Sequence, residues 1–549
     1  MQIKRKLTTT VADSQPIADM FKKREKLTPN ADETKKINRA VAEFLCTDMI
    51  PIYCVEKKGF KNLISSLNPR YELPGRRYFM ENEIPRLYDD VREAIRDDVT
   101  AASYFSCTTD CWTSRNMSSF MSVTAQLISS DWELKSWCLG CFEMLVDHTG
   151  DELKEALYDI LDEWNLDKHR LAGITTDNAS NNVKAFANLQ WLPCFGHNLD
   201  LSVNKALQLE HVSSTLGKLR KTVSGVNRST KRKRKLLTKQ VELGLPQNVL
   251  LHDVSTRWGS TQRMIQRFLE QQNAVSSVLL ADRKSIHLIP GDADLTTLET
   301  VNDVLEPLQT FTDAVSGDKQ VTSSVILPLL WKIFALLAVS DTDSESAAEL
   351  KQIVAIDMET RYADADRKLL LECCTFLDPR FKESFVANPA AVKTKLRAEL
   401  AGAVSAAAGV DTEDTAELKT KKTLKTCSGL HGLLSSIKEA KSGVSTSSPV
   451  ETPTAVKTPK ELFDCEVLLY ESMAETEAEN DPLSWWKGKE STFPVLAQLA
   501  KKYLCISATS CSSERVFSTS GYICNDRRNN LSGDHLDMLV FLAQNLPRI

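Results

Sequence analysis

The stretch AASYFSCTTDCWTSRNMSSFMSVTAQLISSDWELKSWCLGCFEML, residues 101–145, decides the fold. It contains three short runs rich in Val, Thr, Phe, Tyr and Trp, and turn-prone residues separate them. β-Branched and aromatic residues bounded by such turns are typical of strands. The sequence therefore predicts three consecutive strands, over 101–109, 119–129 and 134–145, joined by tight connections.

The residues that follow alternate between helical and strand patterns. Residues 150–166 and 181–189 space their apolar side chains three and four apart, which is the helical period, whereas 171–176 and 190–196 are short apolar runs. The predicted order is strand, strand, strand, helix, strand, helix, strand. This order indicates an α/β fold.

The flanking regions differ in composition from this centre. Residues 32–98 show the helical period, and after about residue 205 long helical patterns dominate until about residue 385. Residues 400–460 are rich in Ala, Ser, Thr, Lys and Pro, which is typical of a flexible linker. We divide the chain into a disordered basic tail (1–31), a small helical domain (32–98), a sheet region (99–205), a long helical region (206–399), a linker (400–460) and a final ordered region (461–549).

The overall composition limits the possible functions. The net charge of -5 is small for 549 residues, so any affinity for nucleic acid must come from local basic patches. The 14 cysteines are scattered without a regular framework, so we expect free thiols in a reducing compartment. No run of eighteen or more apolar residues is present, and we therefore expect no membrane partner.

Two predicted strands end in an aspartate that follows a Thr-Thr pair. The motif SCTTDCWTS places Asp110 at the end of the first strand, and GITTDNASNN places Asp177 at the end of the fourth. If these strands pair in parallel, both acids emerge at one edge of the sheet, where sites form in open α/β sheets. Taken singly, each acid is also typical of a turn or a helix cap.

A third acid, Glu514, lies far along the chain in SATSCSSERVFSTSG, residues 507–521. Three carboxylates would suit magnesium or manganese, hard cations that prefer oxygen ligands, and would complete a two-metal site. The alternative is that Glu514 only complements the dipole of a helix, which is worth about 0.5 kcal/mol. Nothing local in the sequence ties Glu514 to the other two acids.

The C-terminal segment, FPVLAQLAKKYLCISATSCSSERVFSTSGYICNDRRNNLSGDHLDMLVFLAQNL, resembles the dimerisation segment of hAT-superfamily transposases and of host proteins derived from them, including the BED-type zinc finger proteins. TTDCWTS, GITTDNASNN, CFGHNLDLSV and DVSTRWGST resemble further blocks of that family, in the same order. The resemblance covers nearly everything from about residue 35 to 546, apart from the linker.

The resemblance implies an RNase H-like mixed-sheet core, interrupted by a long all-α insertion and preceded by a small helical domain. Residues 99–205 and 461–549 would form the two parts of the core, and 206–399 the insertion. Residues 32–98 would take part in DNA binding or dimerisation.

The resemblance also implies roles for particular residues. Asp110, Asp177 and Glu514 match the catalytic, metal-binding acids of the family, its DDE triad. Cys194 and His197 match a Cys-x-x-His motif that lies beside the active site and the DNA. Without the resemblance, a lone Cys-x-x-His is typical of packing and a hydrogen bond, because two further zinc ligands are not evident.

Trp258 of STRWGST matches a tryptophan of the insertion that stacks on a displaced base, a contact worth about 1–3 kcal/mol. Without the resemblance it is an ordinary core aromatic.

One departure from the family is the BED finger, which needs two cysteines followed by paired histidines. Only Cys46 and Cys54 precede the first strand, and the first histidine is His148, so zinc is not expected in this chain.

Two further features indicate partners. Between residues 218 and 239 the sequence has ten Lys or Arg and no acid, which suits nuclear import or phosphate contact; a solvated charge run is the alternative. The last predicted helix has a broad apolar face. We therefore predict that the protein forms a homodimer or higher homo-oligomer through this helix. The residues concerned are Lys231, Arg232, Lys233, Arg234 and Lys235 for DNA, and Leu536, Leu539, Val540 and Leu542 for dimerisation.

The sequence thus favours a nuclear, dimerising protein that binds duplex DNA, descends from a hAT transposase and regulates transcription. The first alternative is an active metal-dependent transposase that cuts and joins DNA. The second is a protein-interaction factor or a SUMO-ligase-like protein, although no sequence feature establishes a ligase.

Overall fold

The computed structural model describes residues 26–113, 118–145, 148–254, 259–407, 458–524 and 531–548, with the side chains of 401–407 left out. Its central feature is a mixed five-stranded sheet in the order β3-β2-β1-β4-β5. The first three strands are antiparallel neighbours, whereas β4 and β5 run parallel to β1. The strands are β1 (Phe105–Thr113), β2 (Ser119–Ile128), β3 (Leu134–Met144), β4 (Leu171–Thr176) and β5 (Trp191–Pro193).

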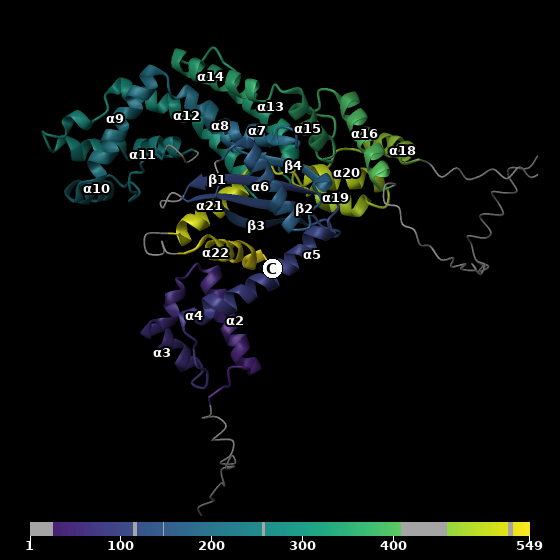
Figure 1. The fold of residues 1–549 in the computed structure, drawn as a ribbon. Helices are drawn as coiled ribbons and strands as arrows, with labels where there is room; N and C mark the ends of the chain where they lie inside the picture. The colour runs from purple at the N-terminus through teal and green to yellow at the C-terminus, as the bar shows by residue number, and fades with distance from the viewer. Residues whose placement is uncertain are drawn as a thin grey trace, which may run out of the picture. The chain divides into compact units, whose positions relative to one another are not determined.

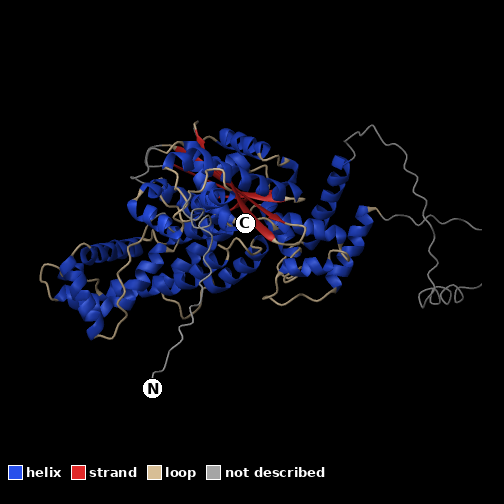
Figure 2. Cartoon of the chain, turned by 90° about the horizontal axis from the view of Figure 1, so that it is seen from below, coloured by secondary structure: helices blue, strands red, loops and turns tan. Residues whose placement is uncertain are grey.

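All five predicted strands and both predicted helices of this region are confirmed. Helix α6 (Gly150–Glu163) begins with a capping box in which the Thr149 side chain accepts from the backbone N–H of Glu152. Helix α7 (Ser180–Phe186) follows β4 and packs against α6. The mixed sheet therefore confirms the α/β class, and Figure 2 shows the strands enclosed by helices.

The predicted N-terminal helices form and join the core of the sheet. Helices α2 and α5 pack against the C-terminal helix α22 (Gly533–Asn545), and their apolar side chains share one buried cluster with β1, β2 and β3. These helices therefore share a buried core with the sheet. The N-terminal elements are α2 (Asp32–Thr47), η1 (Ile52–Glu56), α3 (Lys58–Leu67), α4 (Arg76–Tyr78), η2 (Phe79–Glu83) and α5 (Ile84–Ala101).

A long helical region separates β5 from the last helices of the core, as the sequence predicted (Figure 1). Helix α8 leaves the sheet and packs against α12 and α14, while α9 packs against α10, α11 and α12. The helices are α8 (Phe195–Ala206), α9 (Glu210–Asn227), α10 (Thr230–Glu242), α11 (Ser260–Leu280), η4 (Ile286–Leu288), α12 (Asp292–Ala314), η5 (Ser323–Val325), α13 (Ile326–Leu337), α14 (Glu345–Arg361) and α15 (Ala365–Phe376).

The chain divides into two compact units. The smaller unit, Ala390–Ala474, contains helix α18 (Pro459–Ser472) and most of α16 (Pro389–Ala407), and Arg397 pairs with Asp464 at 2.7 Å between them. Residues 461–474, which we assigned to the core, thus cluster with α16. Most of the predicted linker, like most of the predicted basic tail, lies outside the described residues.

The last four helices return the chain to the sheet. They are α19 (Pro482–Lys489), α20 (Pro494–Leu504), α21 (Cys511–Ile523) and α22, followed by the short η6 (Leu546–Arg548). Helix α21 packs against β1, β2 and β3, and α22 lies along β3, below the sheet in Figure 1. Among the described helices, none is both long enough and apolar enough to cross a membrane.

Candidate active site and DNA-binding surface

The pairing of β1 with β4 brings Asp110 and Asp177 to the same level of the sheet. Thr108 is the register partner of Thr175, and each aspartate lies two residues further along its strand direction. Asp177 follows the end of β4, as predicted, but Asp110 lies within β1, which continues to Thr113. The prediction that Asp110 ends its strand is therefore wrong, because β2 keeps pairing with β1 beyond the point where β4 stops.

Both aspartates also take part in local hydrogen bonds. Asp177 Oδ1 accepts from the backbone N–H of Ala179 at 3.0 Å and from Asn182 Nδ2 at 2.6 Å, while Asp110 Oδ1 accepts from the backbone N–H of Cys111 at 2.8 Å. Asp177 thus stabilises the turn into α7, the structural role that an Asx residue commonly has. This role and a chemical one are compatible.

Helix α21 carries Glu514 in its first turn, and hydroxyl groups fix that turn on the sheet. The Ser513 hydroxyl lies 2.7 Å from the Thr108 hydroxyl, and the Ser122 hydroxyl donates to the Ser513 carbonyl at 3.5 Å. Arg515, on the other side of Glu514, pairs with Asp318. The Ser- and Thr-rich sequence around Glu514 therefore supplies short side chains that join the helix to β1 and β2.

The three acids lie within electrostatic reach of one another. Burial, with repulsion from Asp177 and Glu514, raises the pKa of Asp110 to about 7. Burial, with repulsion from Asp177, also raises the pKa of Glu514 to about 7. The fold thus gathers the three carboxylates that the sequence singled out, although their positions in the chain gave no local link.

The arrangement suits a divalent cation in its donor chemistry. Carboxylate oxygens are the ligands that magnesium and manganese prefer, and a cation would offset the burial and the repulsion that raise these pKa values. Within the described ranges, however, no three His, Cys, Asp or Glu side chains are close enough to hold one metal ion together. The carboxylates are therefore gathered but not arranged as a closed ligand set.

The Cys-x-x-His motif joins α21 to the start of α8. Cys194 is fully buried, and its Sγ accepts from the backbone N–H of Ser510 at 3.4 Å. The prediction that Cys194 contacts DNA is corrected by this burial, because the thiol faces the protein interior. His197 is half-buried; its burial lowers its pKa, and the nearby Asp177 opposes this effect.

Some residues that support the site were missed by the sequence reasoning. Asn182 holds Asp177, and Thr108 and Ser513 hold the helix that carries Glu514. The spacing of Asn182, five residues after Asp177 at the start of a helix, was an available signal for the first contact. No sequence signal pointed to Asp318, which binds Arg515 and, at 2.8 Å, Arg548.

Helix α10 exposes most of the predicted basic run. Lys231, Lys233, Arg234 and Lys235 are exposed. Arg232 instead points inward, donates to the Gly225 carbonyl at 2.8 Å and pairs with Asp282 at 3.2 Å. Arg232 thus also stabilises the helical insertion, and it differs in this from the four exposed cations of α10. Trp258 lies outside the described residues.

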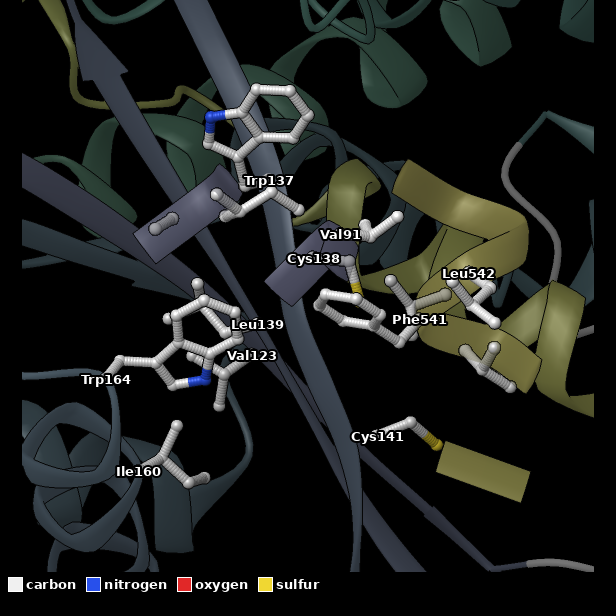
Figure 3. Packing of buried hydrophobic residues seen from close by; sticks show 14 of the residues in the cluster. Val91, Val123, Trp137, Cys138, Leu139, Cys141, Ile160, Trp164, Phe541 and Leu542 are labelled. Carbon is white, nitrogen blue, oxygen red and sulfur yellow. The ribbon is translucent and has the colours of Figure 1, made fainter. Parts of the chain in front are cut away.

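The four residues predicted to form a dimer interface are buried within the chain. Each is at most 6% exposed, because α22 packs its apolar face against β3 and α5. Phe541 of the same helix points toward Cys138 and Val91 (Figure 3), and its ring centroid lies 4.7 Å from that of Tyr88. The prediction is therefore corrected for Leu536, Leu539, Val540 and Leu542.

Comparisons with known families agree with this architecture. Residues 108–201 match the ZBED1 RNase-like domain, and residues 192–304 match the ZBED1 RNase-like helical domain. The core is therefore RNase H-like, with a helical domain following the sheet. Residues 464–546 match the hAT family C-terminal dimerisation region.

The relatives of this chain are zinc finger BED proteins and hAT transposases. It is 27% identical to human zinc finger BED domain-containing protein 4, over 96% of this chain and 45% of that protein. Identity to human zinc finger BED domain-containing protein 6 is 25%, over 93% and 55%. A Zea mays protein that carries the name of the AC transposase is 24% identical, over 89% and 62%. The chain thus spans about half the length of these relatives.

Proposed function

We propose that this chain is a nuclear, dimerising protein that binds duplex DNA and regulates transcription, and that it descends from a hAT transposase. The observation that carries the proposal is the exposed face of α10, where four cations stand without an acid between them. Such a face attracts the phosphate backbone regardless of sequence, and the bound counterions that it releases make the affinity depend on salt. The hAT dimerisation region supports the homo-oligomer.

Names of relatives support the regulatory part of the proposal. A Talaromyces stipitatus protein that is 24% identical, over 91% of this chain and 61% of its own length, is named as a transcriptional regulator. The nuclear location follows from the same basic run, because short clusters of Lys and Arg serve in nuclear import. The proposal thus combines DNA binding, a nuclear location and the regulation of genes.

The experiment compares DNA binding by wild type and two quadruple variants over a range of salt concentrations. The test variant carries Lys231→Gln, Lys233→Gln, Arg234→Gln and Lys235→Gln. Because each phosphate contact contributes about 0.9 to the slope of log K against log salt, we expect the slope to fall by up to about 3.6. The matched control removes four exposed lysines elsewhere, through Lys168→Gln, Lys332→Gln, Lys368→Gln and Lys487→Gln.

Two results decide the test. Wild-type affinity that does not change with salt would contradict any nucleic-acid role. Equal slopes in the test and control variants would remove α10 from the interface.

The same two variants, fused to a fluorescent protein, test nuclear import, because only the α10 variant is expected to stay outside the nucleus. Light scattering over a range of concentrations tests the oligomer, and a monomer mass throughout would contradict it.

The second candidate is a metal-dependent transposase that cuts DNA by hydrolysis and joins strands by transesterification. The observation that favours it is the gathering of Asp110, Asp177 and Glu514, two of which have pKa values raised to about 7. Their carboxylates would hold magnesium or manganese only after moving closer together, because in this arrangement they do not form a three-ligand set. The ion, when bound, would activate the attacking oxygen and stabilise the leaving one. His197 would lie beside them.

A manganese-dependent cleavage assay on duplex DNA separates the two candidates. Cleavage by wild type that disappears in Glu514→Gln supports the enzyme, because this change removes one carboxylate and keeps the shape of the side chain. The absence of cleavage by both proteins leaves only the binding function. Cleavage that persists in Glu514→Gln would contradict the role of this residue.

A further inference from the structure

We propose that a cavity between α9, the start of α10 and η4 binds consecutive phosphates of a DNA backbone. The cavity measures about 790 Å³ and differs from the exposed face of α10 described above. Among the described residues, no carboxylate lines it, and Ser224 and Ser229 add hydroxyl groups. Its cationic lining residues are Lys218, Lys221, Arg228, Arg232 and His287.

The helical period of α9 aligns one wall of the cavity. Lys218, Lys221, Gly225 and Arg228 are spaced three or four residues apart, so they follow one face of the helix and its C-cap. A Cβ atom on Gly225 would lie only 2.7 Å from Leu288 Cδ1, so the glycine allows η4 to approach α9 closely. This approach brings Leu288 of η4 into the lining of the cavity.

Two of the cations form ion pairs within the insertion. Lys218 pairs with Asp294 at 2.8 Å, and Arg232 pairs with Asp282 at 3.2 Å. Neither acid lines the cavity. The ion pairs therefore orient the two cations without placing negative charge on the ligand side.

The charges of Lys221 and Arg228 are available to a ligand. Lys221 and Arg228 are exposed, and within the described part of the chain neither forms an ion pair. The 13-residue helix α10 also begins here, with the Ser229 side chain accepting from the backbone N–H of Arg232 at 3.3 Å. The positive end of the helix dipole adds to the attraction for an anion.

The length of the basic wall favours a polymer of phosphates over a single small anion. From Lys218 to Arg228 the helix rises about 15 Å, and one strand carries about four phosphates over that length of the duplex axis. The exposed cations of α10 extend the same charge beyond the cavity. The inference rests on the proposed DNA binding and specifies where a strand of the backbone lies on the insertion.

The test uses the full chain with Lys221→Gln and Arg228→Gln, two exposed positions whose change leaves the core intact. A control with Lys332→Gln and Lys487→Gln removes the same charge from other exposed sites. Fluorescence anisotropy with a labelled duplex measures the affinity at several salt concentrations. We expect the salt slope to fall by about 1.8 in the cavity variant, which corresponds to about 60-fold weaker binding at 0.1 M salt, and to stay unchanged in the control.

The outcomes separate this inference from the proposed function. If wild type binds with a steep salt slope and the cavity variant has the same slope as the control, the cavity is not part of the interface. If wild type shows no salt-dependent binding, the proposed function itself fails. Calorimetry with inorganic phosphate is the second arm: phosphate binding that the cavity variant loses, without any change in DNA affinity, would assign the cavity to a free anion and overturn the inference.

Discussion

The burial of Asp110, together with repulsion from the two other acids, predicts that removing its charge stabilises the fold. Burial and repulsion raise the pKa of Asp110 from 3.8 to about 7, a difference of about three units. The folded state therefore binds more protons than the unfolded state between about pH 4 and pH 7, so stability falls as the pH rises through this window. At 1.36 kcal/mol for each unit, the cost at pH 8 approaches about 4 kcal/mol.

The perturbation is Asp110→Asn, which removes the charge and keeps an oxygen that can accept from the backbone N–H of Cys111. We expect the variant to exceed wild type in stability by less than about 1 kcal/mol at pH 4 and by up to about 4 kcal/mol at pH 8. Urea unfolding followed by tryptophan fluorescence, at pH 4, 6 and 8, measures the difference.

A matched control and a double variant sharpen this test. Asp303→Asn removes an exposed acid and should show no such dependence on pH. Because Glu514 contributes to the raised pKa of Asp110, the gains from Asp110→Asn and Glu514→Gln should sum to more than the gain of the double variant. A difference between Asp110→Asn and wild type that stays constant from pH 4 to pH 8 would refute the reasoning.

Three further predictions follow from the same structure. At pH 8, manganese at 100 times its Kd should stabilise wild type by about 2.7 kcal/mol and leave the stability of Asp110→Asn unchanged. Differential scanning fluorimetry measures the shift in Tm, and an equal shift in both proteins would place the ion elsewhere. Phe541→Ala should cost about 3–5 kcal/mol in urea unfolding, because the ring is fully buried, whereas Leu243→Ala, at a side chain that is 48% exposed, should cost far less. Asp318→Asn should destabilise the protein by about 1–3 kcal/mol, since it leaves Arg515 and Arg548 without their shared anion, and Arg515→Gln should add little in that background.

Much of the fold could be predicted from local patterns. Runs of Val, Thr and aromatic residues gave the first three strands and short apolar runs gave the last two, because β-branched and apolar residues fit a pleated and buried surface. The packing of residues 32–98 on the core could not be predicted, for a physical reason. Apolar side chains of α5 are shared with β3 and α22, and periodicity shows that a face is buried without showing which element buries it.

The candidate site was predictable in its residues and not in its geometry. The two Thr-Thr-Asp motifs marked the acids on neighbouring parallel strands, although only Asp177 follows a strand end, and the parallel register brings the two acids level. The position of Glu514 depends on hydroxyl contacts between residues about 400 positions apart, such as Thr108 and Ser513, which no local rule can supply. The apolar face of α22 was predicted to be a dimer interface and is instead buried within the chain. Burial inside one chain and burial between two chains leave the same pattern in the sequence, so the sequence could not separate them.

The hydroxyl contact between Thr108 and Ser513 also has a consequence for how the protein is made. The two residues are 405 positions apart, and ribosomes add about 5–20 residues each second, so β1 waits about 20–80 s for its covering helix to be synthesised. During this interval the nascent sheet exposes apolar surface and the unpaired edge of β3, both of which promote aggregation. Chaperone supply and translation speed should therefore influence the yield of this protein more strongly than they do for a chain whose sheet is completed by its nearest neighbours.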